Sequence, residues 1–290
     1  MLSVGEAARL RSITSSWFAA RRREVTISGG HVQTDDGTRY GLWNLAARCH
    51  ELDDPNGWPA LVDEHFTVLL AAQSVDLSTF GDEEFQDALR LRLVEQQQTE
   101  QLDDPGYASE WAPGISRVLV LDLPTTVVTP SRPVFEQRGT AGQLLERAWQ
   151  QTASLVVTED LERLPVGDHD EIWCVVGDSV FTATLAMFLP DLVRRFEPHA
   201  DLSLGVLFSL PHRHQVNYRV IDRPRTALDA LMVMPNFTVA GFLDAASPVT
   251  PSVYLWLDGQ ITQIATFADN KIHVTPGPHL GSLLNQIDDL

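Results

Sequence analysis

A strand that ends at proline reads Arg117-Val118-Leu119-Val120-Leu121-Asp122-Leu123-Pro124. A second apolar run ends in the same Leu-Pro pair and reads Leu204-Gly205-Val206-Leu207-Phe208-Ser209-Leu210-Pro211. After each run comes another extended stretch and then a helical pattern, which begins at Ala141 in the first case and at Thr226 in the second. The sequence therefore predicts a weak internal repeat of strand, turn, strand and helix over 117–152 and 204–243, with both copies in one sheet.

Two copies are too few for a solenoid, but they suit an antiparallel sheet with helices packed on it. Between the copies, a buried strand at 171–176 leads into a predicted helix at 180–196. Farther on, Asp258-Gly259 separates two extended runs, which is a strong hairpin signal. The predicted class is α+β, with a helical N-terminal region that contains one β-hairpin and then the antiparallel sheet.

The N-terminal region shows mainly helical periodicity. The pattern predicts helices at 7–23, 42–52, 58–73 and 82–98, and a hairpin formed by 24–28 and 31–34. The stretch 106–116 contains Gly106, Pro113 and Gly114 and is interpreted as a linker. The predicted organisation is therefore a helical, acidic region at 1–110 and an α+β sheet domain at 117–290.

Composition places the chain among ordinary globular proteins. It has 290 residues, of which 44% are hydrophobic and 21% are charged. Cys49 and Cys174 lie inside apolar runs, which predicts small buried side chains in a reducing cytosol. The first residues lack the apolar stretch of a signal peptide, and no window approaches about 18 uninterrupted apolar residues. We therefore expect a cytoplasmic protein with no membrane span.

Charge argues against a nucleic-acid partner. The chain carries 39 acidic and 21 basic side chains, for a formal net charge of −18. Binding to nucleic acid requires a face of Lys and Arg, but the single lysine is Lys271 and the arginines are scattered apart from Arg21–Arg23. That triplet follows the first predicted helix, where cations favour the helix dipole.

The acidic excess is concentrated in residues 51–110, which hold 15 acidic and two basic side chains. The predicted helices in this segment have inward apolar stripes, so their outward faces carry most of the charge. Two interpretations remain open. The charge either keeps the protein soluble or forms an interface for a basic protein partner, with binding that weakens as salt rises.

Several short motifs resemble one family of bacterial proteins. In chain order they are Leu42-Trp43-Asn44-Leu45-Ala46, Leu121-Asp122-Leu123-Pro124 with a later helix that contains Leu145–Ala148, Gly177-Asp178, Pro211-His212-Arg213, and Pro248–Tyr254 before Trp256-Leu257-Asp258-Gly259. On these motifs the sequence resembles the YtpQ-like family of uncharacterised proteins, although Gln151-Thr152 replaces the Asn-Leu of that pattern. The resemblance implies a soluble α+β protein and passes on no catalytic residue.

The first candidate for chemistry is Gly177-Asp178-Ser179, between a buried strand and a predicted helix. A serine at such a turn can act as a nucleophile, with an oxyanion hole at the helix N-terminus. Esterases with a Gly-Asp-Ser motif take their base from Asp-x-x-His, whereas Asp269 to His273 is one residue too long. The simpler interpretation is that Asp178 or Ser179 caps the helix.

The second candidate is His212-Arg213-His214. Alternate residues of a strand share a face, so both imidazoles could bind a metal, although further ligands such as His199 would be needed. A polar hairpin tip is the alternative. Arg213 either pairs with an acid such as Asp178 or meets an anionic group of a ligand. No Cys-x-x-Cys, His-Glu-x-x-His or phosphate-binding glycine motif is present, so no cofactor or metal is predicted.

The candidate polar cluster therefore consists of Asp178, Ser179, His212, Arg213 and His214, with no catalytic residue assigned. Two classes of function remain. The first is a non-enzymatic binding or adaptor protein, and the second is a hydrolase that uses Ser179 or a metal site at His212 and His214. The missing catalytic and metal motifs favour the binding protein.

Overall fold

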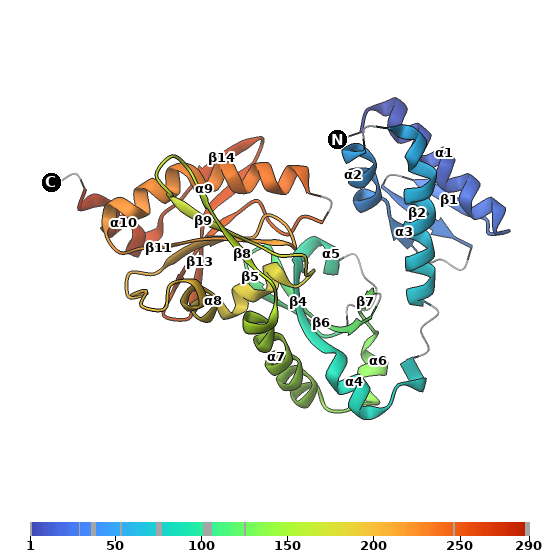
Figure 1. The fold of residues 1–290 in the computed structure, drawn as a ribbon, viewed down its shortest axis with the longest axis horizontal. Coiled ribbons are helices and arrows are strands. Elements are labelled where there is room, and N and C mark those ends of the chain that lie inside the picture. The colour runs from blue at the N-terminus through green and yellow to red at the C-terminus, as the bar shows by residue number, and fades with distance from the viewer. Residues whose placement is uncertain are drawn as a thin grey trace. The chain divides into compact units, whose positions relative to one another are not determined.

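The computed structural model describes residues 2–28, 30–35, 39–52, 54–73, 77–100, 106–124, 126–245 and 247–287 (Figure 1). The chain forms two compact units. The first consists of residues 1–76 with the short segments 124–126 and 244–247, and the second consists of 77–123, 127–243 and 248–290.

The first unit combines helices with a small antiparallel sheet. Its elements are α1 (Val4–Ala20), β1 (Val25–Ser28), β2 (His31–Thr34), β3 (Arg39–Gly41), α2 (Trp43–Glu51), the 3-10 helix η1 (Pro55–Gly57) and α3 (Trp58–Gln73). β1 and β2 pair with Ser28 opposite His31, which confirms the predicted hairpin, and β3 extends the sheet beside β2. The helices expected at 42–52 and 58–73 are confirmed as α2 and α3.

The core of the first unit is built from aromatic rings. Phe18 lies 4.8 Å from Phe66 and 5.0 Å from Trp17, measured between ring centroids. Arg21 stacks on Trp17 at 3.7 Å, and both side chains donate to Oδ1 of Asp63. Arg21 therefore covers the core where α1 ends, which is a structural role for the first residue of the arginine triplet.

The second unit holds the rest of the chain. Its elements are η2 (Leu77–Thr79), α4 (Asp82–Ala88), β4 (Leu89–Glu95), α5 (Gln96–Glu100), β5 (Ala108–Ala112), β6 (Ile115–Leu123), β7 (Thr126–Val128), α6 (Arg132–Glu136), α7 (Ala141–Thr158), β8 (Glu162–Val166), β9 (Ile172–Val176), η3 (Thr182–Phe188), α8 (Leu189–Phe196), β10 (Val206–Ser209), β11 (Gln215–Val220), α9 (Pro224–Asp244), β12 (Val253–Leu257), β13 (Gln260–Ala268), β14 (Lys271–Val274) and α10 (Gly277–Asn285).

Two sheets organise this unit. The larger has the strand order β14-β13-β12-β10-β11-β9-β8, with antiparallel pairing throughout. The smaller has the order β4-β6-β5, with β7 also beside β6. Asp258 and Gly259 have φ angles of 48° and 81° and form the turn between β12 and β13, as predicted. The predicted α+β class is confirmed.

Strand alternation divides the apolar residues of the larger sheet between two cores. Leu207 of β10 packs with Ala230 of α9 and Leu280 of α10, whereas its neighbours Val206 and Phe208 face a core shared with η3, α8 and the smaller sheet. Among the described residues, α9 is the helix whose length and composition would allow it to cross a membrane. The buried side of α9 belongs to the core that contains Leu207 and Leu280.

β4 joins the smaller sheet to the helices. One edge of β4 pairs with β6, with Leu91 opposite Leu119. At the other edge, the Leu91 amide donates to Oγ1 of Thr152 on α7 at 2.8 Å, and the Leu93 amide donates to Oγ1 of Thr184 on η3 at 3.1 Å. Strand edges expose unpaired amides, and these two buried hydroxyls satisfy two of them.

The helix predicted over 82–98 is wrong from Leu89 onward. α4 ends at Ala88 and residues 89–95 form β4. The physical reason is the alternation of buried leucines with arginines, which places every leucine on one face of a strand but would scatter them around a helix. α5 then begins at Gln96.

The linker predicted over 106–116 is also wrong. This stretch contains β5 and the turn into β6, with Gly114 at φ 81°. Because β4 and β5 both pair with β6, these strands belong to the second unit. The boundary expected between 110 and 117 therefore lies inside that unit, and the division falls between Asp76 and Leu77.

The two segments of the predicted repeat have the expected order of strand, turn, strand and helix, but they do not lie in one sheet. β6 pairs with β7 and β10 pairs with β11, and helices follow both pairs, but the two pairs lie in different sheets. The predicted helix at 180–196 is divided into η3 and α8, because Pro190 lacks an amide and stands in the first turn of α8.

Replacement of Thr152 by valine removes the acceptor of the Leu91 amide and keeps the side-chain shape. We expect the free energy of unfolding to fall by about 1–3 kcal/mol, because a buried donor is left unpaired. Thr158→Val on the same helix is the matched control, since its hydroxyl donates to the Ser154 carbonyl at an exposed site. Urea denaturation measures both variants, and equal losses would contradict the role of Thr152.

Candidate functional site

The first turn of the candidate cluster follows β9. Gly177 is required there because a Cβ would lie 2.8 Å from both Leu161 Cδ2 and Thr182 Oγ1. Ser179 organises the turn. Its Oγ accepts from the Phe181 amide at 3.2 Å, and its carbonyl accepts from the Thr182 amide and hydroxyl. These bonds make Ser179 a structural residue of the turn that precedes η3. The helix cap expected at Asp178 or Ser179 is absent, because the N-cap of η3 is Phe181 and has no side-chain cap hydrogen bond.

The second turn connects β10 to β11. His212, Arg213 and His214 lie in this turn between two antiparallel strands, which confirms the polar hairpin tip, and the shared strand face considered for the two imidazoles is not formed. His212 instead bridges to Pro248, and the ring centroids of His212 and His214 are 6.4 Å apart. The cause is Pro211, which follows β10 and has no amide for a further ladder bond.

The structure brings the two turns together. Val176 at the end of β9 is opposite Gln215 at the start of β11, so the residues just outside the two strands are neighbours. The Gly177 amide donates to the His214 carbonyl at 3.2 Å, and the Ala183 amide donates to the Arg213 carbonyl at 2.9 Å. The five predicted residues therefore belong to one junction, although they come from segments more than thirty positions apart in the sequence.

Both ring nitrogens of His214 are engaged at this junction. Arg213 Nε donates to His214 Nε2 at 2.8 Å, and His214 Nδ1 lies 3.2 Å from the Gly177 carbonyl. The arginine is a donor only, so these partners assign the proton to Nδ1. Burial, together with the positive charge of Arg213, lowers the pKa of His214. Burial likewise lowers the pKa of His212.

Metal ligands do not gather elsewhere in the part of the chain that the structure describes. Within it, no group of three or more His, Cys, Asp or Glu side chains could hold a metal ion. The two cysteines are free and buried, and burial raises the pKa of Cys49 to about 11 and that of Cys174 to about 12. Both thiols are therefore protonated near neutral pH, as expected for small core side chains.

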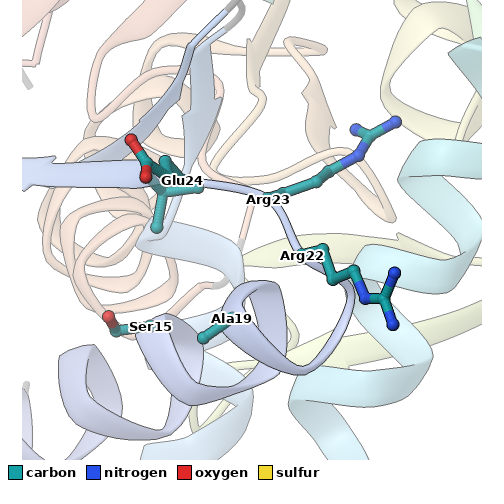
Figure 2. Close-up of a pocket in the computed structure, with 6 residues that line it drawn as sticks. Ser15, Ala19, Arg22, Arg23 and Glu24 are labelled. Carbon is teal, nitrogen blue, oxygen red and sulfur yellow. The ribbon is translucent and has the colours of Figure 1, made fainter.

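A hollow of about 590 Å³ lies in the first unit where α1 meets β1. It is lined by Ser15, Ala19, Arg22, Arg23, Glu24 and Val25. In Figure 2, the side chains of Arg22 and Arg23 leave the backbone on the opposite side from Glu24. The lining groups therefore do not converge on a common point, and the hollow presents no assembled set of ligand-binding groups.

Ion pairs neutralise part of the acidic segment 51–110. Asp63 and Glu64 pair with Arg21 and Arg48, at 2.8 and 3.0 Å. On α4, Asp82 pairs with Arg138 and Asp87 with Arg147, at 2.8 and 2.7 Å. Glu83 and Glu84 lie exposed between these two acids and form no ion pair with a described residue. The acidic surface is therefore less highly charged than its composition indicates.

One residue near the junction was missed by the sequence analysis. This residue is Arg92, which lies on β4. The amide of the following residue, Leu93, donates to Thr184 of η3. Because a helix was predicted over 82–98, Arg92 was not placed on a strand. A signal was present, because Leu89-Arg90-Leu91-Arg92-Leu93 alternates strictly, as a half-buried strand does.

No family model, no curated protein and no solved structure matches this chain. The resemblance of the short motifs to the YtpQ-like family therefore stays a prediction.

The lowered pKa values of His212 and His214 predict a pH-dependent stability. As the pH falls below about 6.5, the unfolded chain binds protons that these folded imidazoles do not. We therefore expect the melting temperature to fall between about pH 7 and 5.5, and to fall less steeply in a His212→Gln, His214→Gln variant. His50→Gln, at an exposed position, is the control. An unchanged slope in the double variant would contradict the prediction.

Proposed function

We propose that the protein is a non-enzymatic binding protein. The observation that carries this proposal is the hydrogen bonding of His214, in which Nδ1 is engaged with the Gly177 carbonyl and Nε2 with Arg213. A serine nucleophile needs a base with an available ring nitrogen to take its proton. Here both nitrogens serve the junction between the two turns.

The hydroxyl of Ser179 supports the same conclusion. Its oxygen accepts from the Phe181 amide, and the Ser179 carbonyl accepts from Thr182. A nucleophile would have to leave this turn arrangement to attack a substrate. A metal site at His212 and His214 would in turn require His214 to release Arg213, because a ring nitrogen that accepts a hydrogen bond has no lone pair left for a metal.

Activity-based labelling tests this proposal against the hydrolase alternative. We expect a fluorophosphonate probe to leave the folded protein unlabelled, because both ring nitrogens of His214 are already hydrogen-bonded and so not available to activate Ser179. Ser179→Ala is the matched control. Labelling of the wild type that disappears in this variant would overturn the proposal. Metal analysis of the same purified protein tests the other alternative, and stoichiometric zinc that is lost with His212→Gln and His214→Gln would also overturn it.

For a protein partner, we propose that α4 provides the contact and that the partner is basic. Glu83 and Glu84 support this choice, since they are exposed and their neighbours Asp82 and Asp87 are already paired. Exposed charge of this kind speeds encounter with a basic surface and is screened by salt.

Capture from lysate at low and high salt tests the role of α4. We expect the captured partner to be lost at high salt and with Glu83→Ser, Glu84→Ser. Glu162→Ser, Asp168→Ser is the matched control, since it removes the same charge from exposed positions outside α4. Capture that depends equally on both double variants would indicate net charge alone and would contradict a specific contact.

A further inference from the structure

The outward face of α9 is apolar although it meets solvent. Residues spaced by three or four positions share one face of a helix, and on α9 this spacing joins Leu228, Met232, Asn236, Ala240 and Leu243. Met232 is 67% exposed and Leu243 is 57% exposed. The outward face of a helix on a globular protein normally carries polar and charged side chains. An exposed apolar face therefore indicates a contact surface.

The charges at the two ends of α9 are the reverse of those that stabilise a single helix. Its first turn contains Arg225 and no acidic residue, Arg223 precedes the helix, and its last residue is Asp244. A helix has a partial positive charge at its N-terminus and a partial negative charge at its C-terminus, so anions are favoured at the first end and cations at the second. Asp222, which accepts from the Thr226 hydroxyl, offsets only part of this mismatch.

These end charges have few partners within the chain. Arg225 pairs with Asp229 at 2.9 Å, and the Arg225 side chain is 63% exposed, so this ion pair contributes little to stability. Arg223 and Asp244 are exposed and form no ion pair with a described residue. A second α9 that runs in the opposite direction would bring Asp244 and the C-terminal carbonyls of one helix beside the arginines of the other. The ends of α9 are therefore complementary to those of an antiparallel copy.

We propose that the outward face of α9 binds the same face of a second copy of this chain, with the two helices antiparallel. A two-fold axis near the middle of the helix exchanges its ends, so one self-complementary patch serves both copies. In this arrangement Arg225 of one copy lies beside Leu243 and Asp244 of the other, and Met232 lies beside Asn236. An asparagine within an apolar helix seam favours one register over the others.

The acidity of the protein does not oppose contact at this face. Residues 222–244 contain two arginines and three aspartates, so α9 carries little of the net charge of −18. A lipid surface suits the helix less well, because amphipathic helices that bind membranes are rich in Lys and Arg on their polar face. One pair of helices buries less surface than an obligate dimer does. We therefore expect a reversible dimer that dissociates on dilution.

Sedimentation of the full chain across a wide range of concentrations tests the interface. We expect the wild type to pass from monomer to dimer as the concentration rises, and Met232→Glu to associate about tenfold more weakly or less, because dimerisation would bury its carboxylate without a partner. Val157→Glu is the matched control, since Val157 is 80% exposed on α7. This control should dimerise within about twofold of the wild type. Both variants should melt as the monomeric wild type does, since the substituted positions are exposed.

Exchange of the end charges tests the antiparallel direction. Arg225→Asp and Asp244→Arg should each weaken the dimer several-fold, because like charges then meet across the interface. The chain with both substitutions should regain the association of the wild type. Net charge alone gives a different expectation. Asp244→Arg makes the chain less acidic, so it would strengthen association if only the overall repulsion between copies mattered.

Four results would overturn the inference. They are a wild type that is monomeric at every concentration, a dimer that Met232→Glu does not weaken, a dimer that Asp244→Arg strengthens, and a doubly exchanged chain that does not regain association. If the monomeric wild type bound phosphatidylcholine vesicles and Met232→Glu did not, the face would belong to a membrane contact. The fluorophosphonate test is independent of all these results, because association of two copies does not involve Ser179.

Discussion

The arrangement of the second unit depends on the hydrogen bonds made by the backbone amides along one edge of β4. β4 has a strand neighbour on one side only, and on the other side Thr152 and Thr184 accept from the amides of Leu91 and Leu93. A buried amide without a partner is costly, so these two hydroxyls hold the smaller sheet against α7 and η3. They also determine the position of the candidate site. η3 follows the Ser179 turn, and its Ala183 amide donates to the Arg213 carbonyl of the second turn. The strand that carries Arg92 and both turns are therefore all bonded to η3 or adjoin it.

The charges of the protein are distributed unevenly between surface and interior. With a net charge of −18, most of the acidic excess meets solvent. Several arginines are used within the fold, as Arg163 illustrates by pairing with Glu197 at 3.0 Å while stacking on Trp173 at 4.1 Å. Arginine suits such positions because its planar group can stack and pair at the same time. Arg92 departs from this pattern, since it is set into the protein without a described acidic partner, and this departure distinguishes it from the arginines that stabilise the fold.

The candidate residues illustrate what a sequence can show about a site. Asp178 and Ser179 were recognisable because they lie in a turn between a buried strand and a helical segment, where polar side chains commonly bond the backbone, and the histidines were recognisable by their spacing. These residues were grouped from the sequence as a candidate cluster, but what brings them together is the pairing of β9 with β11, and nothing local in either strand specifies its partner. The polar hairpin tip at His212–His214 was predictable for a local reason, since Pro211 has no amide to continue the ladder. Arg92 was missed, although the alternation of leucine and arginine around it is visible in the sequence.

The sequence by itself determined the elements whose local signals agree with one another. The α+β class, the hairpin at Asp258-Gly259, and the helices α2 and α3 all follow from periodicity and turn chemistry that act within a few residues. Only the tertiary structure decided where β4, β5 and β6 pair, and this pairing overrode the helix expected beyond Leu89 and the linker expected at 106–116. It also decided that the two Leu-Pro segments enter different sheets. The physical reason is that strand pairing and side-chain burial are long-range: a short apolar run fits several partners, and the core that finally covers it selects one.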